Sequence, residues 1–176
     1  MSGDIKKEIF SWIKTILLAL VLAWIVNNCL VVNATVPTGS MENTIMPNDR
    51  IIAFRLSYLM NEPKRGDIVI FHYPDDTTGK VLYVKRVMGL PGETVEVANG
   101  AVYINGSETP VTENYLKEQP LGDFGPYEVP QGQYFMMGDN RNNSLDSRYW
   151  HHTFVQKSEI LGKVVFRYYK GFKRIQ

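Results

Sequence analysis

The chain has 176 residues, 44% of them hydrophobic, which is enough for one folded domain of moderate size. Nine prolines, fourteen glycines and ten tyrosines indicate many turns and a β-rich body. The formal net charge of +1 implies no broad basic surface, so nothing in the composition points to nucleic acid as a partner.

A long apolar run near the N-terminus predicts a single membrane-spanning helix. Residues 13–32 read IKTILLALVLAWIVNNCLVV. Twenty helical residues extend about 30 Å, which is the thickness of the hydrocarbon core of a bilayer. We therefore expect residues 13–32 to contact lipid and to anchor the chain in the cell membrane.

The charges that flank this run predict its orientation. Three lysines lie on its N-terminal side: Lys6, Lys7 and Lys14. No further Lys or Arg occurs before Arg50. Because positively charged flanks stay in the cytoplasm, residues 1–12 are predicted to be cytoplasmic and residues 33–176 to form an extracytoplasmic domain.

A cleavable signal peptide is the alternative interpretation of the same run. Residues 16–26 are short enough to be its apolar core, and Val32-Asn33-Ala34 is similar to a cleavage site. A retained anchor is favoured because Trp12 and Trp24 are bulky and the apolar run resumes after Asn27-Asn28. Under either interpretation, the rest of the chain is exported across the membrane.

The exported part reads as a mainly β domain. Short apolar runs predict strands at residues 50–54, 67–71, 81–88, 94–97, 101–104, 134–137 and 160–168. Asn99-Gly100 is a strong hairpin-turn signal, and residues 56–60 are compatible with one helical turn. Residues 107–131 are rich in Pro, Gly and acidic side chains and predict a loop-dominated segment. Residues 94–137 therefore form a hairpin and loop-rich insertion.

The cysteine and histidine content restricts the possible chemistry. Cys29 is the only cysteine, which excludes an intrachain disulfide and a cysteine-based zinc site. His151 and His152 are adjacent and would point apart on a strand, while His72 lies at a predicted strand end. These residues suggest no Ser-His-Asp triad, and no metal or cofactor is predicted.

Four segments, in a fixed order behind the predicted anchor, carry a family resemblance. They are PTGSM at 37–41, GDIVIF at 66–71, YVKRVMGLPGE at 83–93 and GDNRNNSLDSR at 138–148. Together they closely resemble the bacterial type I signal peptidases, over nearly the whole chain. The short distance from Glu93 to Gly138 leaves no room for the large second domain of some members, which is similar to the compact forms typical of Gram-positive bacteria.

The resemblance implies a fold and an activity. The fold would be the β-rich catalytic domain of a signal peptidase, preceded by one transmembrane helix. The activity would be that of a membrane-bound serine endopeptidase which removes signal peptides from exported preproteins. Cleavage would follow small residues in an Ala-x-Ala pattern.

Ser40 and Lys85 are the expected nucleophile and general base. A serine hydroxyl needs a neighbouring base to remove its proton, and a lysine base is a known variant of the triad. Lys85 lies among apolar neighbours in the run 81–88. A free lysine, with a pKa of about 10.4, is protonated at pH 7, whereas burial among aliphatic side chains lowers its pKa toward the range a base requires.

The resemblance also implies supporting roles. The Thr38 hydroxyl would join the Ser40 amide in the oxyanion hole, and Ser144 would orient the amine of the lysine. Two ion pairs would support the site: Arg86 with Asp139, and Arg148 with Asp146. Three side chains would line the substrate pocket: Val36, Met41 and Val84.

The sequence departs from the family pattern after the nucleophile. Asn43 occupies a position where the family commonly has proline, and Glu42 adds a charge beside Ser40. Neither change removes a catalytic atom.

Three other classes of protein share some of these features with a signal peptidase. The autoproteolytic Ser-Lys peptidases similar to SOS repressors share the catalytic pair, but they are cytosolic and carry a DNA-binding headpiece instead of a membrane segment. A non-enzymatic exported β-domain would not need every catalytic position to be occupied. A pilin- or sortase-type surface module is disfavoured because the lone cysteine lies within the predicted span.

Overall fold

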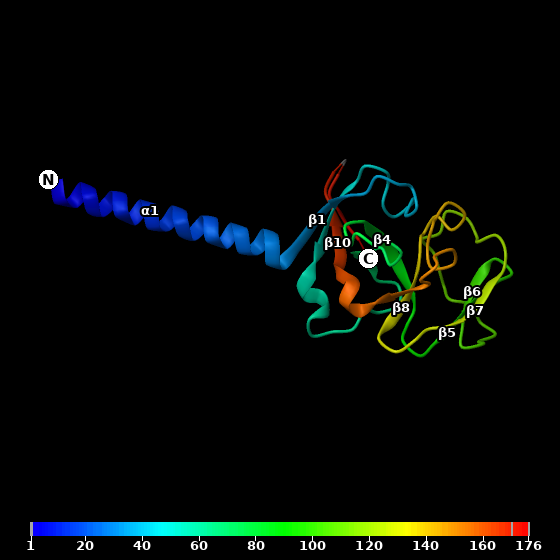
Figure 1. Ribbon diagram of the computed structural model, residues 1–176. Coiled ribbons are helices and arrows are strands. Elements are labelled where there is room, and N and C mark those ends of the chain that lie inside the picture. The colour runs from blue at the N-terminus through cyan, green and yellow to red at the C-terminus, as the bar shows by residue number, and fades with distance from the viewer. Residues whose placement is uncertain (1, 170, 176) are drawn as a thin grey trace.

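A long N-terminal helix leads directly into a β-rich domain in the computed structural model, which describes residues 2–169 and 171–175. Helix α1 (Ser2–Ile25) projects away from the domain (Figure 1). It continues as the π-helical turn η1 (Val26–Leu30) and then enters strand β1 (Val31–Thr35). Ile5–Leu30 is long and apolar enough to cross a membrane, by length and composition.

The predicted span of residues 13–32 is wrong at its C-terminal end. Val31 and Val32 do not continue the helix but pair with strand β2, Val31 opposite Phe54 and Val32 opposite Ala53. Branched valines fit a pleated sheet well, and Val32 is buried there. Cleavage after Ala34, at the candidate signal-peptide site, would cut through β1, which pairs with β2.

Two antiparallel sheets make up the domain. The larger has the order β1-β2-β10-β3-β4-β8-β9, with β11 beside β10. Its further strands are β2 (Arg50–Phe54), β3 (Ile68–His72), β4 (Leu82–Gly89), β8 (Gln133–Met137), β9 (Phe154–Gln156), β10 (Ile160–Arg167) and β11 (Lys173–Arg174). The smaller has the order β6-β5-β7 and comprises β5 (Thr94–Ala98), β6 (Ala101–Ile104) and β7 (Phe124–Glu128).

Most predicted elements are confirmed, and the differences are local. Each of the seven predicted strands is present, and Asn99 and Gly100 form the β5–β6 turn with φ angles of 51° and 76°. The predicted helical turn is the 3-10 helix η2 (Arg55–Tyr58), and η3 (Lys157–Glu159) is a second one. The segment 107–131, predicted to be loop-dominated, contains strand β7, which pairs with β5.

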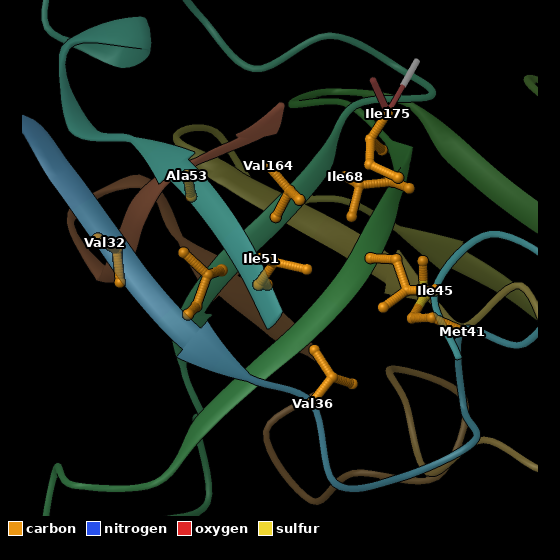
Figure 2. Packing of buried hydrophobic residues seen from close by; sticks show 10 residues of the cluster. Val32, Val36, Met41, Ile45, Ile51, Ala53, Ile68, Val164 and Ile175 are labelled. Carbon is orange, nitrogen blue, oxygen red and sulfur yellow. The ribbon is translucent and has the colours of Figure 1, made fainter. Parts of the chain in front are cut away.

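One buried cluster fixes the segment that follows β1. Met41 and Ile45 are fully buried and pack with Ile51, Ile68 and Val164 of the larger sheet. Figure 2 shows Met41 and Ile45 side by side at one end of this cluster. Burying a side chain of this size contributes about 1.5–3 kcal/mol. Because β1 pairs with β2 before this loop and Met41 and Ile45 are buried within it, the loop is held against the larger sheet.

Candidate active site

Ser40 lies in a loop that is held at several points. Its neighbour Met41 is anchored in the core, and its own backbone carbonyl accepts a hydrogen bond of 3.0 Å from the backbone N–H of Asn140. The side-chain amide of Asn140 donates to the carbonyl of Gly39, also at 3.0 Å. Only 7% of Ser40 is exposed, so its hydroxyl has a fixed and largely dry position.

Strand β4 brings Lys85 to this hydroxyl. The two residues are 45 positions apart in the chain, yet Lys85 Nζ lies 2.6 Å from Ser40 Oγ. Lys85 is 4% exposed, and its Nζ also lies 5.4 Å from the centre of the Tyr83 ring. The structure therefore brings together the predicted nucleophile and base within hydrogen-bond distance.

The environment of Lys85 favours the neutral amine. Burial lowers the pKa of Lys85 to about 8; attraction to Asp146 acts against this shift, and repulsion by Arg148 acts with it. Among the described residues no carboxylate forms an ion pair with Lys85, because Asp139 and Asp146 are each paired with an arginine. An amine with this pKa is partly neutral near pH 7 and can accept a proton.

Thr38 lies on the cleft beside the nucleophile. Its Oγ1 is 3.5 Å from Ser40 Oγ, at the outer limit of a hydrogen bond. The hydroxyl thus stands near the atom that would attack a carbonyl, where it can donate to an oxygen that gains charge.

Ser144 does not make the contact expected of it. Its Oγ is buried and has no hydrogen-bond partner among the described residues, and no bond to Lys85 is present. The hydroxyl lies so close to Gly138 that a Cβ there would come within 2.2 Å of Ser144 Oγ and 2.5 Å of the Ser40 carbonyl oxygen. Only glycine at position 138 leaves room for this approach.

The ion pair between Arg86 and Asp139 joins three parts of the site. Arg86 Nε and Nη2 donate to the two carboxylate oxygens of Asp139 at 2.8 and 2.7 Å, and both side chains are buried. The Thr44 hydroxyl also donates to Asp139. Strand β4, the loop after Ser40 and the loop after β8 are thereby tied together.

The second ion pair, between Arg148 and Asp146, lies in the loop after β8. Arg148 Nε and Nη2 donate to Asp146 at 2.8 and 2.9 Å, and both side chains are fully buried. Asp146 also accepts the backbone N–H of Gly138 at 2.9 Å, and Arg148 donates to the carbonyl of Arg141 at 2.6 Å. This pair fixes the course of the loop that carries Ser144.

We expect Arg148→Met to lower the free energy of unfolding by about 3–5 kcal/mol, because it leaves Asp146 charged, buried and unpaired. Lys157→Met is the matched control, since it removes an exposed partner of Glu62 and should change stability by about 1 kcal/mol or less. Urea unfolding of the detergent-solubilised chain, followed by circular dichroism, measures both variants. Equal losses in the two variants would contradict the structural role of the buried pair.

The departures after the nucleophile have visible consequences. Asn43 has a φ of 78°, in the left-handed region, which a proline cannot adopt because its ring fixes φ near about −65°. The turn after Ser40 therefore suits asparagine and not the proline common in the family. Glu42 forms an ion pair of 3.0 Å with Lys117, which ties this turn to the insertion.

A cleft of about 250 Å³ opens beside Ser40 and Lys85. Val36 and Val84, two of the three residues predicted for the substrate pocket, are among its lining residues. Met41 is not, because its side chain is fully buried in the core cluster shown in Figure 2. The pocket role expected for Met41 is therefore wrong in this structure, since the residue after the nucleophile turns inward and anchors the loop.

Five further residues of the cleft were missed from the sequence: Thr35, Pro37, Tyr83, Asn143 and Leu145. The position of Tyr83 in the cleft could have been predicted from the sequence. It precedes Lys85 by two residues, and residues two apart on a strand share a face. A larger cavity, of about 700 Å³, surrounds His72 and His152 and contains neither Ser40 nor Lys85. Among the described residues, a buried lysine amine is hydrogen-bonded to a serine hydroxyl in the smaller cleft, at Ser40 and Lys85.

The histidines lie away from this cleft, and none of them is among its lining residues. His151 and His152 are not on a strand but in a bend before β9, and their ring centroids are 5.0 Å apart. The expectation that they point apart is therefore wrong, while His72 does end strand β3.

A serine hydroxyl beside a buried, unpaired lysine amine, open to an apolar cleft, has the arrangement that a serine hydrolase with a lysine base requires. Comparisons with known proteins agree with this class. The family described as "Signal peptidase, peptidase S26" matches residues 9–169. A probable signal peptidase I-2 of Synechocystis sp. is 40% identical over 159 residues, which covers 89% of this chain and 71% of that protein.

Relatives in Bacillus and Enterococcus show the same family. Signal peptidase I S of Bacillus subtilis is 39% identical, with 93% of this chain and 91% of the relative covered. The crystal structure of a signal peptidase I from Enterococcus faecalis is 36% identical, with a TM-score of 0.50, and covers 58% of this chain and 97% of that one. The chain therefore belongs to the signal peptidase family, peptidase S26. It is a protease of the type I group, and its apolar helix α1 is consistent with the membrane-bound members.

Proposed function

We propose that the chain cleaves the signal peptides of exported preproteins, with Ser40 as nucleophile and Lys85 as general base. The observation that carries this proposal is the distance of 2.6 Å between the hydroxyl and an amine that is 4% exposed. No histidine lies in the cleft to serve as base. Burial supplies the low pKa that a lysine needs for this role.

The reaction follows from this geometry in two stages. Lys85 removes the proton of Ser40 Oγ, which attacks the scissile carbonyl and forms a tetrahedral intermediate. Thr38 Oγ1 and the Ser40 N–H donate to the resulting oxyanion. The Lys85 ammonium protonates the departing amine, which leaves the signal peptide as an ester on Ser40. Water, deprotonated by Lys85, then hydrolyses the ester.

The unpaired edge of β4 supports an extended substrate. Strand β8 pairs with β4 only from Arg86 onward. Among the described residues, the part of β4 before Arg86 therefore has no strand partner on the side away from β3. A peptide can add there as a further strand and present alternate side chains to the cleft. The cleft has a volume of only about 250 Å³ and includes Val36, Val84 and Leu145 in its lining, which fits the small residues of an Ala-x-Ala sequence.

The membrane orientation proposed is that of an exported protease. The lysines before and at the start of the apolar run, Lys6, Lys7 and Lys14, favour a cytoplasmic N-terminus. The catalytic domain then lies outside the membrane, next to helix α1. There it meets signal peptides as they emerge from the same bilayer.

A cleavage assay with the full-length chain in detergent tests the substrate class. We expect a preprotein with alanine before the scissile bond to be processed at least ~100-fold faster than the same preprotein with leucine there, since the larger side chain overfills the cleft. Chelation of metal ions should leave the rate unchanged. Equal cleavage of both preproteins would contradict the small-residue pocket, and failure to cleave either would contradict the proposed substrate.

A further inference from the structure

Three potential metal ligands meet on the surface, on a different set of residues from those of the cleft. They are Asp75, in the turn after β3, and His151 and His152, in the bend before β9. One ligand atom from each lies within 4.8 Å of the other two. Zinc ligands stand about 2.0–2.2 Å from the ion, so small rotations of exposed imidazole rings bring all three atoms into range.

Backbone hydrogen bonds hold the Asp75 carboxylate in place. Its two oxygens accept the backbone N–H groups of His151 and His152 at 2.9 and 2.8 Å. The Tyr73 hydroxyl donates to the same carboxylate at 3.1 Å. The carboxylate is therefore fixed against the backbone of the two histidines, whatever positions their rings adopt.

The histidine rings lie at the surface beside this carboxylate. The side chain of His152 is 67% exposed, and its Nδ1 lies 2.7 Å from Asp75 Oδ1. His151 is also exposed. A cation can take the place of the proton between His152 Nδ1 and Asp75 Oδ1, and that proton is released to water.

The local charge favours a cation. The Asp75 carboxylate lies within hydrogen-bond distance of the His152 ring and is held there by backbone N–H groups. Among the described residues no Lys or Arg pairs with this carboxylate. The adjacent Asp76 is a second carboxylate, and it accepts the backbone N–H groups of Thr78, Lys80 and Val81. Two acidic side chains therefore lie near His152, since Asp75 contacts its ring and Asp76 lines the same cavity.

We propose that Asp75, His151 and His152 form a binding site for one divalent transition-metal ion. Two imidazoles and one carboxylate match the ligand preferences of Zn²⁺, Ni²⁺ and Cu²⁺, whereas Ca²⁺ and Mg²⁺ require oxygen ligands throughout. Water completes the coordination, because the histidines face solvent and a cavity of about 700 Å³ adjoins His152.

A bound ion would join two loops that support the cleft. Tyr73, whose hydroxyl contacts Asp75, stacks on Tyr83 of the cleft with ring centroids 4.4 Å apart. Trp150, directly before His151, packs on both tyrosine rings at 5.5 and 5.9 Å. The bound ion therefore stabilises the turn after β3 and the bend before β9 relative to each other, without contact to Ser40 or Lys85.

Calorimetric titration with zinc chloride tests the site, using the full-length chain in detergent and without a polyhistidine tag. We expect one Zn²⁺ per chain with a Kd in the micromolar range, and an increase of about 5 °C in Tm at a 100-fold excess over Kd. The double variant His151→Gln/His152→Gln should bind at least ~10-fold more weakly. Because it keeps the backbone N–H groups that hold Asp75, it should fold normally.

Glu159→Gln is the matched control. Glu159 lines the adjoining cavity but is not one of the three ligands, so its loss removes a nearby negative charge and should weaken binding less than ~3-fold. The site is contradicted by a wild-type chain that binds no Zn²⁺ at 1 mM, by a double variant that weakens binding less than 10-fold, or by a Glu159→Gln effect as large as that of the double variant.

Discussion

Replacing Ser40 with alanine is expected to reduce the rate of preprotein cleavage by on the order of 10⁴-fold or more. The hydroxyl is the only nucleophile in hydrogen-bond contact with Lys85 among the described residues, so its loss removes the acyl-enzyme route. The fold should be unaffected, because Met41 and Ile45 anchor the loop independently of the hydroxyl. Single-turnover cleavage of a radiolabelled preprotein measures the effect.

Ser158→Ala is the control for this substitution. Ser158 lies in the 3-10 helix η3, is exposed and is not among the cleft residues, so its variant should cleave at the wild-type rate. The unfolding midpoint of Ser40→Ala should stay within about 2 °C of the wild type. If a folded Ser40→Ala chain retained more than a tenth of the activity, another residue would have to be the nucleophile.

The fold was largely predictable from local patterns in the sequence. Strands β2 and β6 have the predicted limits, because clear turn residues bound their apolar runs. Strand β1 was missed because Val31 and Val32 continue the apolar run of the anchor, and valine is compatible with both a buried strand and a lipid-facing helix. Pairing with β2 decides that Val31 and Val32 form a strand and not a helix, and no pattern within the apolar run indicates this pairing.

Strands β7 and β9 show a different limit. β7 contains Gly125-Pro126, two residues that usually interrupt a strand. It is held by its pairing with β5 and by packing of Phe124 and Tyr127 against the core. β9 is three residues long, which is too short for an alternating pattern to be recognised. Both depend on partners that lie far away in the sequence.

Motifs in the sequence indicate which residues to expect in the site, but not their contacts. Ser40 and Lys85 were identified from motifs, and a separation of 45 residues gives no geometric clue that they meet. The family resemblance implies a pocket role for Met41, yet packing with Ile45 draws its side chain inward. Ser144 was expected to bond to the lysine, but its hydroxyl lies against Gly138. Such choices among neighbours depend on packing in three dimensions.

The second prediction with a large expected effect is the pH dependence of the cleavage rate. Because the pKa of Lys85 is about 8 in the folded protein, the single-turnover rate should increase about tenfold per pH unit below pH 8 and level off above it. Cleavage at pH 6 is then expected to be about 100-fold slower than on the plateau. Stopped reactions between pH 6 and 10, with circular dichroism at each pH, measure the profile. A rate that stayed constant across this range would exclude a lysine base of this pKa.

The same pKa predicts a change in stability that does not depend on catalysis. Between about pH 8 and the unfolded pKa of about 10.5, the folded state holds fewer protons than the unfolded state, so the free energy of unfolding increases with pH. The gain from Lys85 alone is on the order of 3 kcal/mol, at about 1.4 kcal/mol per unit. Lys85→Met is the matched variant, because it keeps the length of the side chain without the charge. It should be inactive, at least as stable as the wild type at pH 7, and without this increase. Parallel stability curves for the two chains from pH 7 to 10 would mean that Lys85 is not forced toward neutrality by its burial.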